Sequence, residues 1–133
     1  MALSGSFYNY PVKSFGLYCE WSASQSVTGN YSNVTLKVYL SYWDLYVGAR
    51  DDGVINIAGN SSNFSTAAIS ESSSGWKKKL IAQKTVTVYH DGNGNANCYL
   101  GASWRFSGTY SGTSIGTITA EQTVSLDKLD RSA

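Results

Sequence analysis

The stretch that decides the fold, residues 84–106, reads KTVTVYHDGNGNANCYLGASWRF. Its middle, residues 91–95, contains only Asp, Gly and Asn, which tolerate positive φ angles and hydrogen-bond their own backbone, as tight turns require. After the turn, apolar residues occupy alternate positions, namely Ala96, Cys98, Leu100, Ala102, Trp104 and Phe106. A period of two over this length is typical of a half-buried strand. We therefore predict that the two arms form a central β-hairpin.

Three other runs show the same alternation. Residues on their predicted inward faces are Phe15, Leu17, Cys19, Trp21 and Ala23; Val34, Leu36, Val38, Leu40 and Tyr42; and Ile118, Ala120, Gln122, Val124 and Leu126. Even spacing of such runs favours two packed sheets. We predict an all-β fold, an antiparallel two-sheet β-sandwich of jelly-roll or immunoglobulin-like type with about eight strands, as a single domain over residues 1–133. Its predicted core contains Trp21, Leu36, Val38, Leu40, Cys98, Leu100, Trp104, Ile118 and Val124.

The composition agrees with this class and limits the partners. Of 133 residues, ten are Tyr, four are Trp, thirteen are Gly and one is Pro, a mixture that suits strands and turns rather than helices. A net charge of +1 creates no field that would favour nucleic acid or an anionic membrane. No apolar run approaches the roughly 18 residues of a membrane span, and no leader peptide is recognisable. We expect neither a nucleic-acid nor a membrane partner, and synthesis in the cytoplasm.

The two cysteines, Cys19 and Cys98, both fall on predicted inward faces. Buried free thiols that act as small hydrophobic side chains are the favoured interpretation. An inter-sheet disulfide, as in immunoglobulin-like domains, is the alternative.

Residues with catalytic or metal-binding chemistry are few. The single histidine, His90, directly precedes the turn, and its neighbour Asp91 would point to the opposite face of a strand, so a Ser-His-Asp arrangement is not supported. Asp91, Asn93 and Asn95 offer oxygen ligands at alternate positions, but the glycine spacing and the lack of a following Glu differ from a calcium loop. We predict no enzyme, no cofactor and no metal, with calcium at this turn as the alternative.

The one run of charge is Lys77-Lys78-Lys79, which follows Trp76. Lysines on an edge strand discourage pairing between sheets of different molecules, and this is the favoured interpretation. Contact with an anion or an acidic polymer is the alternative.

Aromatic residues on the predicted outward faces are the best functional clue. Flat rings bury the apolar face of a sugar without demanding hydrogen bonds, while Asn, Asp and Arg bind its hydroxyl groups. A subunit interface would explain exposed aromatic residues equally well. The candidate ligand-binding residues are Tyr39, Trp43, Tyr46, Trp76, Tyr99, Arg105 and Tyr110.

Four segments together suggest a family. They are SGSFY at 4–8, WSASQS at 21–26, VTVYHDGNG at 86–94 and LDKLDRSA at 126–133. The chain thereby resembles a β-rich module of minor structural and tail-tip proteins of siphoviruses that infect Gram-positive bacteria. Asp130 stands where the exit segment of that module usually has Pro. The resemblance implies a virion component that attaches to the host surface, with cell-wall polysaccharide as its ligand.

These observations lead to two predicted functions. The first is a non-catalytic phage tail or fibre module, located in the virion tail, that recognises host cell-wall carbohydrate and contacts other virion proteins, with homo-oligomerisation as an option. Weak single-site contacts become effective in such an assembly through avidity. The alternative is a purely structural spacer or decoration domain, in which the aromatic residues form protein–protein contacts.

Overall fold

The structure is a computed structural model that describes residues 3–72, 75–110 and 112–129. It is all-β, which confirms the predicted class, and its strands number ten rather than about eight. Two of the ten are short strands of three residues each, which the sequence pattern did not separate from their surroundings. The strands are β1 (Ser4–Val12), β2 (Phe15–Ser26), β3 (Tyr31–Tyr42), β4 (Leu45–Val47), β5 (Arg50–Ile57), β6 (Asn60–Thr66), β7 (Ile69–Glu71), β8 (Lys77–Tyr89), β9 (Asn97–Tyr110) and β10 (Thr113–Ser125).

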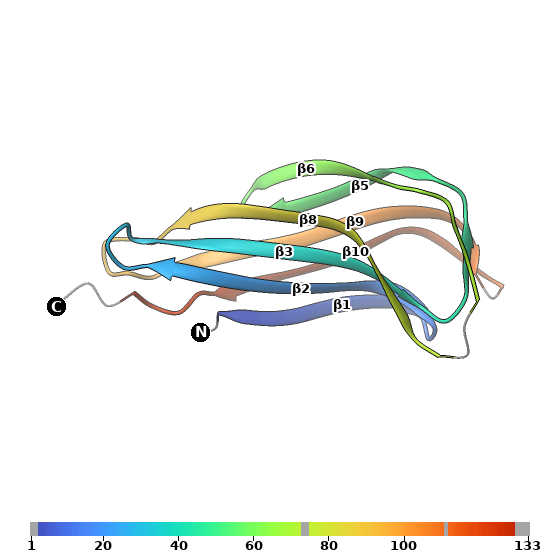
Figure 1. The fold of residues 1–133 in the computed structure, drawn as a ribbon, viewed down its shortest axis with the longest axis horizontal. Coiled ribbons are helices and arrows are strands. Elements are labelled where there is room, and N and C mark those ends of the chain that lie inside the picture. Colours follow the sequence, from blue (N-terminus) through green and yellow to red (C-terminus); the bar gives the residue numbers. More distant parts are fainter. Residues whose placement is uncertain (1–2, 73–74, 111, 130–133) are drawn as a thin grey trace.

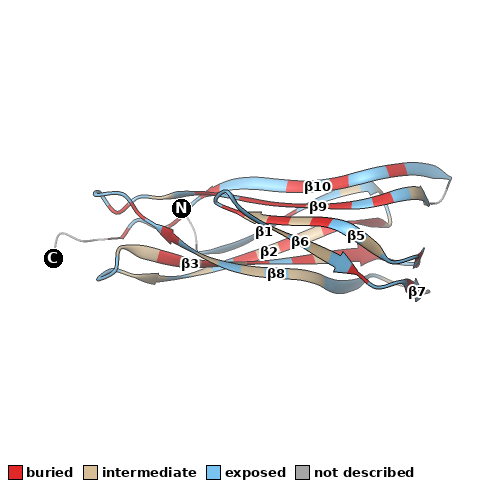
Figure 2. Cartoon of the chain, turned by 90° about the horizontal axis from the view of Figure 1, so that it is seen from above, coloured by how far each residue is buried: buried red, intermediate tan, exposed pale blue. Residues whose placement is uncertain are grey.

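Two four-stranded antiparallel sheets form the body of the molecule. Sheet I has the order β1-β2-β3-β8 and sheet II the order β10-β9-β5-β6, while β4 and β7 pair as a small third sheet. Figure 1 shows an elongated molecule whose long strands follow its long axis. In Figure 2 the two sheets lie one over the other, with buried positions concentrated between them. This arrangement leaves each sheet with one outer face.

The predicted central hairpin is wrong, because its two arms belong to different sheets. Strand β8 pairs with β3 in sheet I, whereas β9 pairs with β10 and β5 in sheet II. The turn between them therefore joins the sheets across the end of the sandwich. The backbone N–H of Asp91 donates to the carbonyl of Asn95 over 2.8 Å, and Gly94 has a φ of +83°. A turn of this composition can close a hairpin or connect two sheets. Strands β8 and β9 both pack against the core, from opposite sides.

The core lies between the sheets and contains all nine predicted residues, each of which is buried. Gln122 is the exception among the inward predictions: it is exposed, since β10 is an edge strand and its side chain is not covered. Cys19 and Cys98 are buried free thiols, as the favoured interpretation held. Burial raises the pKa of Cys19 to about 12 and that of Cys98 to about 11.

Side chains close both open edges of the sandwich. On one edge, the Asn9 amide Nδ2 in β1 donates to the Thr119 carbonyl in β10 over 2.8 Å. On the other, Lys84 Nζ in β8 donates to Ser62 Oγ in β6 over 2.6 Å. These bonds link the two sheets at both edges of the sandwich. The two linked sheets thus hold the side chains on their outer faces in fixed positions.

Candidate functional site

The seven predicted ligand-binding residues fall into three places. Tyr39, Trp43 and Trp76 lie on or beside the outer face of sheet I, and Tyr46 and Tyr110 lie at one end of the sandwich. Tyr99 and Arg105 lie on the outer face of sheet II, in β9. Because Trp43 belongs to both of the first two places, the structure brings five of the seven residues into one continuous region.

The strand register of sheet I builds a row of apolar side chains across its outer face. Tyr8 of β1 pairs with Tyr18 of β2, Tyr18 pairs with Tyr39 of β3, and Tyr39 pairs with Leu80 of β8. Neighbouring pairs in such a ladder lie about 4.5–5.5 Å apart at Cβ, so their side chains touch. The rings of Tyr8 and Tyr18 are stacked with centroids 6.3 Å apart. One row therefore spans all four strands of the sheet.

Ring contacts extend this row toward one end of the sheet. Tyr8 contacts Tyr10 at 5.4 Å between centroids, Tyr10 contacts Trp76 at 5.6 Å, and Trp76 contacts Trp43 at 6.2 Å, all edge to face. Tyr8 is 65% exposed and Trp76 52% exposed despite these contacts. We call the six residues the aromatic face: Tyr8, Tyr10, Tyr18, Tyr39, Trp43 and Trp76. Rings that support one another are held in place while much of their surface stays open to solvent.

Three members of the aromatic face, Tyr8, Tyr10 and Tyr18, were missed by the sequence analysis. Pro11 makes the end of the first strand look irregular, and the alternation around Tyr8 is short. The structure also explains how the chain comes close here: a Cβ on Gly16 would lie 2.5 Å from the Asn9 carbonyl oxygen and 2.7 Å from Tyr10 Cδ2. Gly16 thus gives the backbone and ring of β1 room to lie against β2. Pairing the first three predicted strands so that Tyr8, Tyr18 and Tyr39 lie side by side would have identified this group of tyrosines.

A charged pair lies within the aromatic face. Lys78 Nζ is 4.8 Å from the ring centroid of Tyr18 and 4.9 Å from that of Tyr39, which is cation–π geometry. The same Nζ donates to Glu20 Oε1 over 2.8 Å, and this hydrogen bond raises the pKa of Lys78 above its ordinary value. Lys78 therefore contacts two rings and one carboxylate at once. The lysine run lies on an edge strand of sheet I, as the favoured interpretation expected.

A hollow at the end of the sandwich continues the aromatic face. It has a volume of about 390 Å³ and is lined by Ser14, Trp43, Asp44, Tyr46, Phe106, Thr109 and Tyr110. Its residues come from the turns after β1 and β3, from β4 and from the last part of β9. Since Trp43 contacts Trp76 and also lines this hollow, the two features meet without a break. We call it the end pocket.

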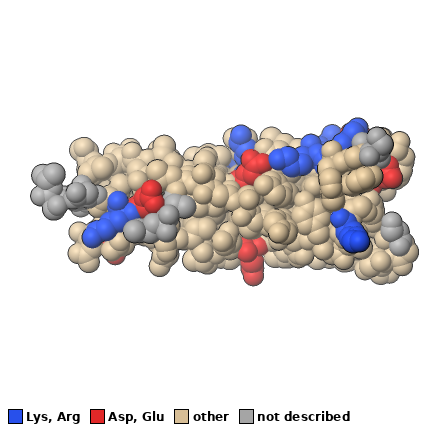
Figure 3. Space-filling view, turned by 90° about the horizontal axis from the view of Figure 1, so that it is seen from below, with Lys and Arg blue, Asp and Glu red and all other residues tan. Residues whose placement is uncertain are grey.

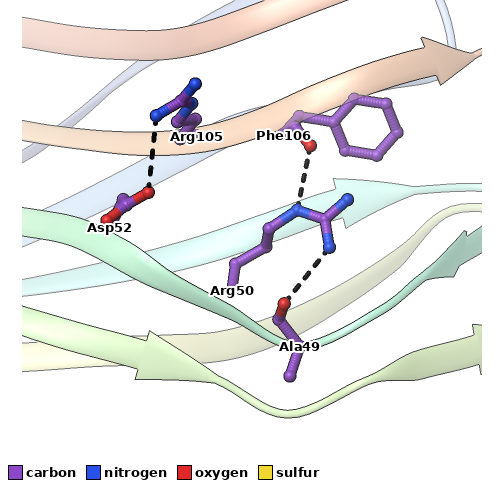
Figure 4. A network of polar contacts seen from close by, with 5 residues as sticks. All are labelled: Ala49, Arg50, Asp52, Arg105 and Phe106. Carbon is purple, nitrogen blue, oxygen red and sulfur yellow. Dashed lines mark hydrogen bonds and ion pairs between the residues drawn. The ribbon is translucent and has the colours of Figure 1, made fainter.

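The two predicted residues on sheet II are engaged by their own sheet. Tyr99 Oη donates to Glu121 Oε2 over 2.6 Å, and this bond raises the pKa of Tyr99 above its usual value. Arg105 lies 3.7 Å from Asp52, and Figure 4 shows this pair beside Arg50. Arg50 Nε donates to the Phe106 carbonyl over 2.9 Å. Tyr99 and Arg105 are therefore separated from the aromatic face by the thickness of the sandwich.

His90 and the turn after it are occupied by structural hydrogen bonds. The His90 ring lies 2.7 Å from the Gly94 carbonyl at Nδ1 and 2.7 Å from Ser32 Oγ at Nε2. Since a carbonyl only accepts, Nδ1 carries the proton, and in the neutral ring Nε2 accepts from the serine. Asp91 Oδ1 accepts from the backbone N–H groups of Asn93 and Asn95, each over 2.9 Å. The histidine thus holds the turn by a contact with the Gly94 carbonyl, and its ring is engaged at both nitrogens.

The rest of the described surface offers little further chemistry. Within residues 3–72, 75–110 and 112–129, no group of three or more His, Cys, Asp or Glu side chains is placed to hold a metal ion. The part of the chain that the structure describes also contains no helix with the length and hydrophobicity needed to span a bilayer. In Figure 3, charged side chains form a few separate groups on a surface that is mostly uncharged.

Comparisons with protein-family models, with curated proteins and with solved structures found no match to this chain. The last segment of the predicted resemblance, residues 126–133, lies partly outside the described residues, since 130–133 are not described.

Proposed function

We propose that this chain is a non-catalytic recognition module of a phage tail or fibre, and that it binds carbohydrate of the host cell wall through the aromatic face. The observation that carries the proposal is the contiguity of six aromatic side chains on one rigid sheet, with Tyr8 and Trp76 more than half exposed. Monomeric proteins rarely expose contiguous apolar surface of this kind without a use for it.

The chemistry of the aromatic face favours a glycan over a flat apolar partner. The exposed rings of Tyr8 and Trp76 can stack on the apolar faces of sugars and bury them without demanding hydrogen bonds. The Glu20 carboxylate and the Lys78 ammonium lie among the rings and can exchange hydrogen bonds with hydroxyl groups. Trp76 and Trp43 meet edge to face at 78°, so they form an uneven surface rather than a flat plate. Such a surface fits a chain of sugar units better than the smooth face of another sheet.

The virion setting comes from the resemblance of the sequence to siphovirus tail modules, and the geometry is compatible with it. A single shallow site binds one glycan weakly, so repetition of the module in a tail would supply the avidity. Other virion proteins are the expected neighbours of such a module.

The test is retention of the chain on purified Gram-positive cell walls and on an array of immobilised glycans, with the chain both as prepared and tetramerised through a biotin tag. Trp76→Ala is expected to weaken retention about tenfold or more, since it removes the exposed ring that connects Tyr10 to Trp43. Tyr89→Ala is the matched control, because Tyr89 is an exposed ring at the other end of β8 that contacts Tyr31 at 5.8 Å and, among the described residues, no ring of the aromatic face. Circular dichroism would check that both variants fold.

Two results would overturn the proposal. One is the absence of retention on walls and glycans even by the tetramerised chain. The other is light scattering that shows a stable oligomer which Trp76→Ala dissociates. The second result would support the structural module that the sequence analysis kept as its alternative.

A further inference from the structure

We infer that the end pocket is the specificity subsite of this module and that it holds one uncharged sugar unit of the glycan whose neighbouring units lie on the aromatic face. The inference rests on the proposed function and assigns different roles in glycan binding to the aromatic face and the end pocket. The aromatic face stacks on sugars with little selectivity, and the end pocket selects which sugar is bound.

Continuity between the two features is the first step. Trp43 is 39% exposed, contacts Trp76 at 6.2 Å between ring centroids and lines the end pocket. A chain of sugar units bound over Tyr10 and Trp76 would therefore meet Trp43 next and then the hollow beyond it. Tyr46, which also lines the pocket, is 64% exposed, so its ring offers apolar surface to a bound sugar.

Rigidity of the pocket wall is the second step. Tyr110 Oη donates to the Asp44 carbonyl over 2.7 Å and lies 3.3 Å from the Ser14 carbonyl. Its ring stacks on Phe15 at 4.9 Å between centroids, and Phe15 is completely buried. The side chain of Tyr110 consequently ties the last part of β9 to the turns after β1 and β3. A wall that is fixed before binding loses little conformational entropy when a ligand arrives.

The lining chemistry is the third step, and it decides the class of ligand. Ser14 and Thr109 carry hydroxyl groups that can bind the hydroxyls of a ligand, and the aromatic rings supply apolar contact, which is the composition of a small-molecule pocket. Among the described residues that line it, none is a lysine or an arginine. A phosphate or a carboxylate placed there would lose hydration without gaining a cationic partner from these lining residues. The pocket therefore suits a neutral or N-acetylated sugar and disfavours a uronic acid or a phosphorylated one.

The volume agrees with one occupant. At about 390 Å³ the pocket lies near the lower end of the roughly 300–1,000 Å³ that small-molecule sites span. A second hollow of about 550 Å³ lies by the His90 turn, and none of its lining residues belongs to the aromatic face. Of these two hollows, the end pocket is the one that adjoins the aromatic face.

The experiment compares short and long ligands with two single-ring variants. The short probes are glucose, galactose, rhamnose, N-acetylglucosamine and glucuronic acid, followed by tryptophan fluorescence and by ligand-observed NMR. The long probes are oligosaccharides of increasing length built from whichever sugar binds. Tyr46→Ala should weaken binding of short and long probes alike by about tenfold, since the pocket is common to both. Tyr8→Ala should leave short probes unchanged and weaken only the long ones.

A second variant keeps the test valid if Tyr46→Ala disturbs the fold. Thr109→Val removes one hydroxyl from the pocket at nearly constant shape, and it should alter which of the neutral sugars is preferred while long-chain stacking persists.

The outcomes separate the two claims. If long probes bind and lose affinity in Trp76→Ala, while Tyr46→Ala and Thr109→Val change nothing, the inference is overturned and the proposed function survives. Preferred binding of glucuronic acid would overturn the assigned chemistry. If no carbohydrate binds at all, the proposed function and the inference fall together.

Discussion

The outer faces of the two sheets have the same pleat and similar strand lengths but opposite surface chemistry. On sheet I, Tyr8 and Tyr18 contact other rings, and Tyr8 remains 65% exposed. On sheet II, the ring of Tyr99 lies over Gly101, its hydroxyl group is bonded to Glu121, and it is 36% exposed. The outward positions of the adjacent strand β10 are mostly Thr and Ser. An exposed aromatic residue is thus a good binding candidate only where its own sheet leaves its ring and hydroxyl group unused.

The two faces also differ in how glycine is used. At Gly16, the approaching atoms include the backbone of β1, so the absence of a Cβ lets two strands come together under the aromatic face. At Gly101, the approaching atoms belong to the side chain of Tyr99, which covers bare backbone. Glycine lets the strands approach under the aromatic face of sheet I, whereas on sheet II it accommodates the ring of Tyr99.

Both sheets pack against one core, so the largest loss of stability is expected from a substitution in that core. Trp104 is completely buried, and its Nε1 donates to Thr66 Oγ1 over 3.2 Å. Trp104→Ala should lower the free energy of unfolding by about 3–5 kcal/mol, because it creates a cavity and leaves Thr66 without this donor. Urea unfolding followed by circular dichroism measures this. Trp76→Ala is the control and should change stability by less than about 0.5 kcal/mol; similar losses in both variants would contradict the assigned core.

The next effect in size tests the two glycines directly. Gly16→Ala should destabilise the fold by about 1–3 kcal/mol, because backbone atoms of Asn9 and Tyr10 must move to admit the new Cβ. Gly101→Ala should cost less, since the ring of Tyr99 can swing away at the expense of its bond to Glu121. Urea midpoints of the two variants provide the comparison. A larger loss in Gly101→Ala would show that the ring on sheet II is the more firmly held one.

The sequence predicted the fold class and the core well because both follow from local alternation. Leu36 and Trp104, for example, lie in runs whose period of two leaves one choice of inward face. The pairing of those runs was less accessible. Residues 91–95 form a turn as predicted, but whether a turn closes a hairpin or crosses between sheets depends on which distant strands compete for pairing. In this fold β8 pairs with β3, and β9 pairs with β10.

The candidate site was predicted in part for the same reason. Periodicity identifies Tyr39 as outward and Tyr99 as outward, but it cannot tell which sheet either belongs to. Tyr8 and Tyr18 become part of the site only through register with Tyr39, which is a long-range property. Trp43 and Trp76 meet because the chain returns after β7, and no local pattern encodes that contact.

A smaller effect on stability is expected from the two buried thiols, Cys19 on the inner face of sheet I and Cys98 on the inner face of sheet II. Burial raises the pKa of Cys19 to about 12 and of Cys98 to about 11, from a model-peptide value near 9. Above pH 9 the unfolded chain loses thiol protons that the folded chain keeps. The stability that each thiol contributes is therefore complete below pH 9 and is lost as the pH rises through its folded pKa, by at most about 1.4 kcal/mol per pH unit for one group.

The measurement is the slope of unfolding free energy against pH between about 8 and 11. Cys19→Ala should flatten this slope more than Cys98→Ala, since the pKa of Cys19 is raised further. Comparing slopes rather than absolute stabilities removes the packing loss that each substitution also causes. Identical slopes in both variants and in the original chain would indicate that the thiols are ionised as easily in the fold as out of it.

The smallest effect on stability is expected when one exposed ion pair is removed from each sheet, and this test sharpens the comparison of the faces most. Lys78 contacts Glu20 at 2.8 Å on sheet I, and Arg105 lies 3.7 Å from Asp52 on sheet II. Neither Lys78→Gln nor Arg105→Gln should move the thermal midpoint detectably, because solvent screens both pairs.

The effects of these two substitutions on glycan binding should differ. Lys78 lies over the rings of Tyr18 and Tyr39, so Lys78→Gln should shift the NMR signals of both rings and alter glycan affinity. Arg105→Gln should do neither, since a charge on sheet II has no contact with the aromatic face; an equal loss of affinity in both variants would mean that the ligand reaches both sides of the sandwich.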